Sequence, residues 1–299
     1  MKYTKQPLTI DEQIELLKSR GLEFNDVNEA KNSLLNISYY RLSSYLYPFR
    51  IPNDDKQRFM SGTIFEDILK FYSFDRKLRL LIFDSVERIE ISVRTQLIYQ
   101  LSLKHNSQWY LENSLFRNSH SFNKIIESFV QEYKNSEEIF IKHYKYKYNE
   151  PEFPPAWIGL EIFTFGQLSK HYSNLAHNND KQSISRYFNL QHQVFESWLH
   201  SLVYVRNLCA HHSRIWNRIL AIKPIIPKPK NIDWINDFNF RHDKLYLLLC
   251  IIKYFLQSAH PRNTFAQKLN NLIGQYPNID ISKMGFPDSW RNEKFWTML

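Results

Sequence analysis

Apolar residues recur at intervals of three or four along most of this chain, which is the spacing of one face of an α-helix. The longest such run lies between residues 63 and 107, a stretch without glycine or proline. Its apolar positions are Leu78, Ile82, Val86, Ile89, Val93, Leu97 and Leu101. The pattern predicts one long helix, or two helices that break near Asp75. Glu90 and Arg94 lie four residues apart, in the order that favours an ion pair along a helix.

Polar residues mark where the N-terminal helices should begin. Thr9 with Glu12, and Thr63 with Glu66, have the spacing of a capping box, in which each side chain accepts a hydrogen bond from the other residue's backbone N–H. The first box predicts a helix that ends near Gly21. We further expect a short helix at 28–35, an aromatic segment at 36–47 that Pro48 ends, and a loop at 51–62.

The second half of the chain is also helical in character. The predicted elements are helices at 154–174, 193–221, 243–259 and 263–273, a turn at 178–181, and helix with a basic loop at 143–148 within the polar stretch 107–150. No segment alternates with the period of a strand, so the predicted fold class is all-α. We expect three parts: an N-terminal helical extension (1–62), a helical-bundle core (63–221, with an insertion at 107–150) and a C-terminal helical appendage (222–299) that begins with a connector rich in proline and lysine.

Composition excludes several classes of enzyme. The 299 residues include 43% hydrophobic residues, enough for a substantial core. The chain has only six glycines, and they are scattered. No glycine-rich phosphate loop, dinucleotide-binding motif or G-x-S-x-G nucleophile elbow is therefore possible. The two cysteines, Cys209 and Cys250, are too few for a disulfide scaffold or a cysteine zinc site. No H-E-x-x-H motif or other ligand spacing is present, so we predict neither a metal nor another cofactor.

The charge balance favours a polyanionic partner. Lysine and arginine number 39 and aspartate and glutamate 30, which gives a net charge of +9. RNA or DNA is the first partner to consider, although a basic surface can also serve solubility alone. The N-terminal residues lack the apolar run of a signal peptide, and the most apolar stretch, 245–252, is far shorter than the roughly 20 residues of a membrane span. We therefore expect a soluble, cytoplasmic protein with no membrane partner.

The segment from Tyr204 to Arg214 carries the strongest chemical signal. On a continuous helix, the polar residues His200, Tyr204, His211, Arg214 and Arg218 all fall within about 60° of Asn207. The opposite face is apolar, with Trp198, Leu202, Val205, Cys209, Trp216 and Ile219. Arg206 lies at the flank of the polar stripe, with a side chain long enough to reach it. The spacing thus predicts a helix that packs on one face and presents imidazole, guanidinium and carboxamide groups on the other.

These groups suit the metal-independent cleavage of RNA. A guanidinium can hold two phosphate oxygens, and an imidazole moves protons near neutral pH. The 2′-OH would attack the adjacent phosphorus and expel the 5′-oxygen, and DNA would resist because it lacks that hydroxyl. A solvated polar face with no catalytic role is the simpler explanation of the same pattern. His212 falls among the apolar positions, so we expect it to be buried and structural, although it could replace His211 as the acid or base.

Several segments in order resemble a known protein family. Arg206-Asn207-x-x-x-His211 resembles the R-x4-6-H motif of HEPN-domain ribonucleases, in its common Arg-Asn form. The surrounding sequence resembles the Abi_2 abortive-infection family of bacterial phage-defence proteins, of the AbiD/AbiF type. The similar segments are Ile37–Leu42, Phe74–Arg79, Glu87–Arg94, Pro155–Trp157 with Phe165–Gly166, and Arg206–Asn217. The resemblance covers roughly residues 5–220.

The resemblance implies a HEPN-like helical bundle in which two such motifs meet at a homodimer interface and form one ribonuclease site. The resemblance implies that Arg206 and His211 are the catalytic pair. It implies that Asn207 either orients the motif or forms a hydrogen bond with the second copy across the interface. The side chains expected to bind RNA are Arg214, Arg218, His200, Tyr204 and Arg94, each of which could instead be ordinary surface or packing charge. The alternatives are a non-catalytic protein that binds a structured small non-coding RNA, in a regulated complex, and a helical adaptor.

Overall fold

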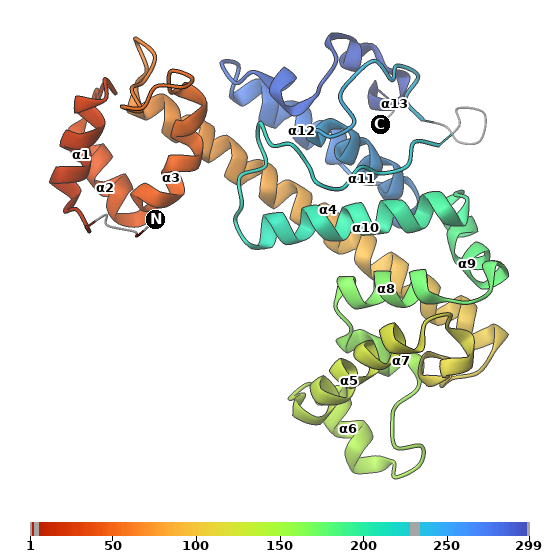
Figure 1. The fold of residues 1–299 in the computed structure, drawn as a ribbon. Coiled ribbons are helices and arrows are strands. Elements are labelled where there is room, and N and C mark those ends of the chain that lie inside the picture. The colour runs from red at the N-terminus through yellow and green to blue at the C-terminus, as the bar shows by residue number, and fades with distance from the viewer. Residues whose placement is uncertain (1, 3–5, 228–233, 298–299) are drawn as a thin grey trace.

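The fold is all-α in the part of the chain that the computed structural model describes, which is residues 2, 6–227 and 234–297. Figure 1 shows the long helix α4 crossing the molecule, with α1, α2 and α3 gathered at one end and α5 and α6 lying toward the other. The helices are α1 (Ile10–Ser19), α2 (Val27–Ile37), α3 (Tyr39–Leu46), α4 (Phe65–Lys104), α5 (Ser119–Asn135), α6 (Ile139–Lys147), α7 (Ala156–Gly159), α8 (Phe165–Asn174), α9 (Asn178–Ser185), α10 (His192–Ala210), α11 (Leu245–Ala259), α12 (Phe265–Gln275) and α13 (Lys294–Thr297). None of the described helices is long and apolar enough to cross a membrane.

Helix α4 is continuous through Asp75, and its predicted apolar face is buried. Each of the seven apolar residues from Leu78 to Leu101 that mark the stripe is at most 1% exposed. At about 1.5 Å per residue, its 40 residues span roughly 60 Å. It contacts α3 near its first turns, α10, α11 and α12 along its middle, and α7, α8 and α9 toward its end. The fold is thus organised around one apolar face of one helix.

Two hydrophobic cores lie along α4. The smaller one joins α1, α2 and α3 to the first turns of α4 through residues such as Leu17, Leu34, Leu42 and Phe65. The larger one contains the rest of α4 and the helices that follow it in the chain. Phe49 and Phe71 pack against both cores, with ring centroids 4.9 Å apart. The expected division of the chain into 1–62, 63–221 and 222–299 remains a prediction.

The two predicted capping boxes have different outcomes. Thr9 and Glu12 form theirs, with the Thr9 backbone N–H donating to Glu12 at 2.7 Å. The box at Thr63 and Glu66 is wrong, because α4 begins one residue later, with Ile64 at its N-cap. The Thr63 hydroxyl instead donates to the Met60 carbonyl at 2.6 Å. The Glu66 carboxylate accepts from the backbone N–H groups at the entrance to α2, which joins the N-terminal helices to α4.

Three further predictions of local structure need correction. The basic segment 143–148 is helical as far as Lys147, in α6, and is not a loop. The predicted turn at 178–181 is the first turn of α9. The predicted helix 154–174 is interrupted after α7, and α8 starts anew because Thr164 and Gln167 form a capping box there. Of the predicted connector, residues 228–230 lie outside the described part of the chain.

Candidate functional site

Helix α10 carries the motif and packs as its apolar face predicts. Trp198, Leu202 and Val205 are fully buried, and Cys209 is 4% exposed. The helix contacts α4, α8, α9 and α11, so its position is determined from several sides. The polar stripe on its other face is open, with His200, Asn207 and His211 exposed and Tyr204 half-buried. The Tyr204 hydroxyl accepts a bond from the Ala221 backbone N–H at 3.4 Å.

The helix ends at Ala210 and does not continue to residue 221 as predicted. The Ser213 N–H donates to the Leu208 carbonyl at 2.9 Å and the His212 N–H to the Cys209 carbonyl at 3.0 Å, which is the pattern of a Schellman motif. His212 takes the left-handed position of this motif, with φ at 55°. A histidine there lacks the freedom of glycine, so its conformation is held by the contacts of the residues that follow.

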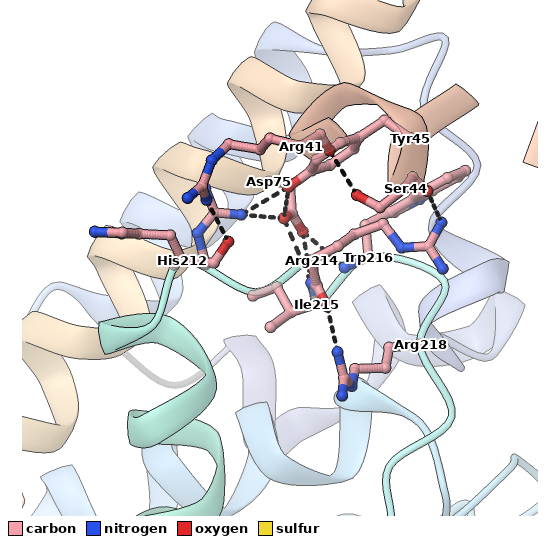
Figure 2. A network of polar contacts seen from close by, with 10 residues as sticks. Arg41, Ser44, Tyr45, Asp75, His212, Arg214, Ile215, Trp216 and Arg218 are labelled. Atoms are coloured by element: carbon pink, nitrogen blue, oxygen red, sulfur yellow. Dashed lines mark hydrogen bonds and ion pairs between the residues drawn. The ribbon is translucent and has the colours of Figure 1, made fainter. Parts of the chain in front are cut away.

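Those contacts centre on Asp75 of α4, which is fully buried (Figure 2). Its carboxylate accepts from the backbone N–H groups of Ile215 at 3.2 Å and Trp216 at 2.7 Å. It also accepts from the Tyr45 hydroxyl at 2.6 Å and pairs with the Arg79 guanidinium. The segment after α10 is therefore bound, through its backbone, to a carboxylate that lies 140 residues earlier in the chain.

Burial and hydrogen bonding act on the Asp75 carboxyl group in opposite directions. Burial is the larger effect and raises its pKa above the ordinary value, while the four donors, Tyr45, Arg79 and the two backbone N–H groups, favour the carboxylate. Burial and the nearby Asp75 raise the pKa of Tyr45, so its hydroxyl stays a proton donor. A buried carboxylate with these partners is well suited to positioning a backbone segment, because removing any donor would leave charge unsatisfied.

Helix α3 also holds the segment that follows α10. Arg41 donates to the His212 carbonyl at 3.2 Å, and Arg214 donates to the Ser44 carbonyl (Figure 2). Burial lowers the pKa of the Arg214 guanidinium. Arg218 donates to the Arg214 carbonyl at 3.3 Å. The N-terminal helices thus contact the candidate site directly, through groups that sequence spacing did not connect to it.

The early end of α10 changes where four predicted residues lie. Arg214 and Arg218 are not on the helix, so they do not extend its polar stripe. His212, expected to be buried, is exposed, and its imidazole points away from Asp75. Ile219, expected on the apolar face, is 63% exposed. All four lie beyond residue 210, where the periodicity of the helix no longer determines which way a side chain points.

Arg206 turns from α10 toward α4, where it meets Glu90. The guanidinium lies 3.5 Å from the Glu90 carboxylate and 3.2 Å from the Asn207 side-chain oxygen, and the Arg206 side chain keeps 27% exposure. Glu90 also binds Arg94 at 3.0 Å, as the sequence predicted. Arg94 reaches the Phe163 carbonyl at 3.0 Å and Glu161 at 3.6 Å. Arg94 therefore belongs to the ion-pair network beside Arg206.

The structure brings some of the predicted site residues together and separates others. Arg206, Asn207 and Arg94 share one polar network, and His211 caps the same helix four residues after Asn207, with its N–H donating to the Asn207 carbonyl at 2.9 Å. Within the described residues, no hydrogen bond joins the His211 imidazole to another side chain. The same part of the chain holds no cluster of three or more His, Cys, Asp or Glu side chains placed to bind a metal ion.

Sequence reasoning missed the role of Asp75, although a signal was present. Asp75 and Arg79 are charged residues on the buried face of α4, at positions where Phe74, Leu78 and Ile82 are apolar. A carboxylate and a guanidinium four residues apart on such a face should pair when buried. The sequence pattern does not indicate that the backbone N–H groups of Ile215 and Trp216 also bind Asp75.

Comparison with protein families gives one match. The Abi-like protein family, Abi_2, matches residues 32–217, which contain α3, α4, α10 and the segment bound to Asp75. The chain therefore belongs to the Abi-like family, and it is an abortive-infection protein. Comparison with curated proteins and with solved structures finds no match.

Proposed function

We propose that this abortive-infection protein is a metal-independent endoribonuclease of the HEPN type, related to AbiD and AbiF proteins, and that it acts as a homodimer in the cytoplasm. Two copies would place Arg206, Asn207 and His211 from each chain around one shared cleft. Within the cleft, the 2′-OH of RNA attacks the adjacent phosphorus and forms a new P–O bond. The bond from phosphorus to the 5′-oxygen breaks, which leaves a 2′,3′-cyclic phosphate and a 5′-hydroxyl.

The observation that carries the proposal is the accessibility of the motif on an anchored helix end. Asn207 and His211 are exposed and Arg206 is partly exposed, while the backbone after them is held by Asp75. Catalysis by proton transfer needs an imidazole that can reach the substrate and that is held in a fixed position relative to it. A histidine exposed at the end of a packed helix meets both needs.

Each residue has a distinct role in the proposed reaction. His211 transfers a proton at the 2′-oxygen or at the leaving 5′-oxygen. Arg206 binds the phosphoryl oxygens as negative charge develops on them. Asn207 orients Arg206, because its side-chain oxygen already accepts a bond from the guanidinium at 3.2 Å.

The test compares the wild type with His211→Ala on labelled RNA in the presence of EDTA. Cleavage by the wild type alone, with 2′,3′-cyclic phosphate ends, is the expected result. The matched control is His212→Ala, which alters the exposed neighbour outside the motif and should still cleave. Equal cleavage by the wild type and His211→Ala, or no cleavage by the wild type, would contradict the proposed reaction.

A second function is favoured by the position of Arg206. Its guanidinium already contacts Glu90, a carboxylate 15% exposed, so in this structure it is not free to bind a phosphate. This arrangement suits a protein that binds a structured small non-coding RNA without cleaving it, or that is inactive until Arg206 leaves Glu90. Salt-sensitive RNA binding of equal strength by the wild type and His211→Ala, without cleavage, would support this alternative. Absence of any RNA binding would favour an adaptor.

A further inference from the structure

A groove lies beside the N-terminal half of α10, on the same face of the helix as the candidate site. It has a volume of about 590 Å³ and is formed by α8, α9, the N-terminal half of α10, Arg117 just before α5, and Ile225. Its polar lining includes Arg117, Lys170, Lys181, His192, Glu196 and His200. His200 belongs to the open stripe that continues through Tyr204 and Asn207 to His211. The groove and the motif are therefore joined by one exposed helix face.

Positive charge predominates in this groove. Lys181 is buried and paired with Glu196 at 2.8 Å, which accounts for the one carboxylate among the lining residues. Arg117 and Lys170 are exposed, and in the described chain neither forms an ion pair. Two cationic side chains are thus left without an acidic partner. The Arg117 guanidinium does not move freely, since it donates to the Ser173 carbonyl.

The positive charge in the groove affects the pKa values of His192 and Lys181. Burial lowers the pKa of His192, and the charges of Lys181 and Arg117 lower it further, against the opposite effect of Glu196. Burial also lowers the pKa of Lys181, and Arg117 contributes in the same direction, against the effect of Glu196. His192 Nδ1 is buried and has no hydrogen-bond partner within the described residues. Cations that disfavour one another's charge are stabilised when an anion binds among them.

We propose that this groove binds the sugar-phosphate backbone of single-stranded RNA and guides the strand along α10 to the motif. This inference rests on the proposed function, because it describes how RNA reaches the same site. Along the helix axis, His200 and His211 are about 16 Å apart at 1.5 Å per residue, so a strand bound in the groove passes the motif within a few nucleotides. Arg117 and Lys170 contact phosphates, which gives affinity without sequence preference.

Binding of a short fluorescein-labelled single-stranded RNA, followed by anisotropy over a range of salt concentrations, tests the proposal. All proteins carry His211→Ala so that cleavage does not interfere. The groove variant Arg117→Gln/Lys170→Gln should bind roughly tenfold or more weakly at 0.1 M salt, and the slope of log K against log salt should fall by about 1.4 for two lost phosphate contacts. The matched control is Lys56→Gln/Lys134→Gln, which removes two exposed lysines outside the groove and the same net charge.

The outcomes separate this proposal from the proposed function. Weaker binding by the groove variant than by the control supports the groove. Equal binding by the two variants would contradict the proposal that the groove binds RNA. The ribonuclease proposal would then be decided separately, by whether the wild type cleaves RNA in EDTA. If the parent protein binds no RNA at low salt, both proposals fail. Circular dichroism of each variant checks that the fold is retained.

Discussion

Two acid–arginine pairs on α4 have the same spacing but different surroundings. Asp75 pairs with Arg79 and Glu90 with Arg94, each four residues apart. Asp75 is fully buried and accepts from a tyrosine and two backbone N–H groups. Glu90 keeps 15% exposure and accepts instead from Arg206, at a longer 3.5 Å. Asp75 binds the backbone that follows the motif, and Glu90 binds the side chain of Arg206 within it.

The difference indicates that identical local spacing serves two purposes. A buried carboxylate with every donor in place holds a segment firmly, because breaking any contact leaves unsatisfied charge. The Glu90–Arg206 pair is only partly buried, and its 3.5 Å separation is long, so it should contribute less than the Asp75 contacts. Asp75 therefore anchors the end of α10, while Glu90 holds Arg206 less firmly, as the proposed binding of a phosphate requires. The predictions below test this contrast.

The largest expected effect is that of Asp75→Ala. Removing the carboxylate leaves the buried Arg79 without its ionic partner and two backbone N–H groups without an acceptor, so the free energy of unfolding should fall by about 3–5 kcal/mol. Urea denaturation measures it. The matched control is Asp84→Ala, which removes an exposed carboxylate paired with Arg88 on the same helix and should cost under about 1 kcal/mol. Similar losses in the two variants would contradict the anchoring role of Asp75.

A smaller loss is expected for Tyr45→Phe, which deletes one donor to the buried carboxylate. A hydrogen bond to a charged group contributes about 1.5–3 kcal/mol, so stability should fall by that amount. Tyr72→Phe is the control, because Tyr72 packs edge-on against Tyr45 while its hydroxyl has no hydrogen-bond partner in the described chain. If both tyrosine variants are as stable as the wild type, the Tyr45 hydroxyl does not support Asp75.

His212→Gly should raise stability. Its left-handed backbone at the helix end suits glycine, so we expect a gain of about 0.5–1 kcal/mol, with the Arg41 contact retained because it uses the His212 carbonyl. Ala210→Gly, at the last residue of α10, should instead lose up to about 1 kcal/mol. Thermal or urea unfolding compares them. A loss of stability in His212→Gly would show that the histidine side chain itself supports the turn.

The smallest effect is expected for the coupling between Glu90 and Arg206. A double-mutant cycle with Glu90→Gln and Arg206→Gln should give about 0.2–1 kcal/mol, and the coupling should weaken as salt is added. The corresponding cycle for Asp75 and Arg79 should give a larger value with little dependence on salt. A strong, salt-independent coupling at Glu90 would mean that Arg206 is fixed in place and unsuited to binding a phosphate.

The sequence predicted local features well where one helix face determined them. The apolar stripe of α4, the capping box at Thr9, the Glu90–Arg94 pair and the all-α class are all confirmed. These features depend on residues within a turn or two of each other, so periodicity contains the necessary information. The catalytic and RNA-binding roles assigned to particular residues remain predictions.

The sequence could not predict where α10 ends. Helical spacing continued past residue 210, and no glycine marks the stop, because His212 occupies the position that glycine favours. The stop depends on Asp75, 140 residues away, which accepts the N–H groups that a longer helix would have used internally. Long-range contacts of this kind override local propensity, and they explain why the expected positions of Arg214 and Arg218 were wrong.

The 140 residues that separate Asp75 from Ile215 determine when this contact can form during protein synthesis. The smaller core lies within residues 10–72, so it can close soon after the ribosome has made that stretch. Tyr45 and Arg79 are available to Asp75 from the start, but its two backbone donors, the N–H groups of Ile215 and Trp216, are made much later. A nascent chain interrupted before that point would have the smaller core complete, but the segment after α10 would not yet be bound to Asp75. Any activity that depends on the anchored motif would therefore arise only after residue 216 had been translated.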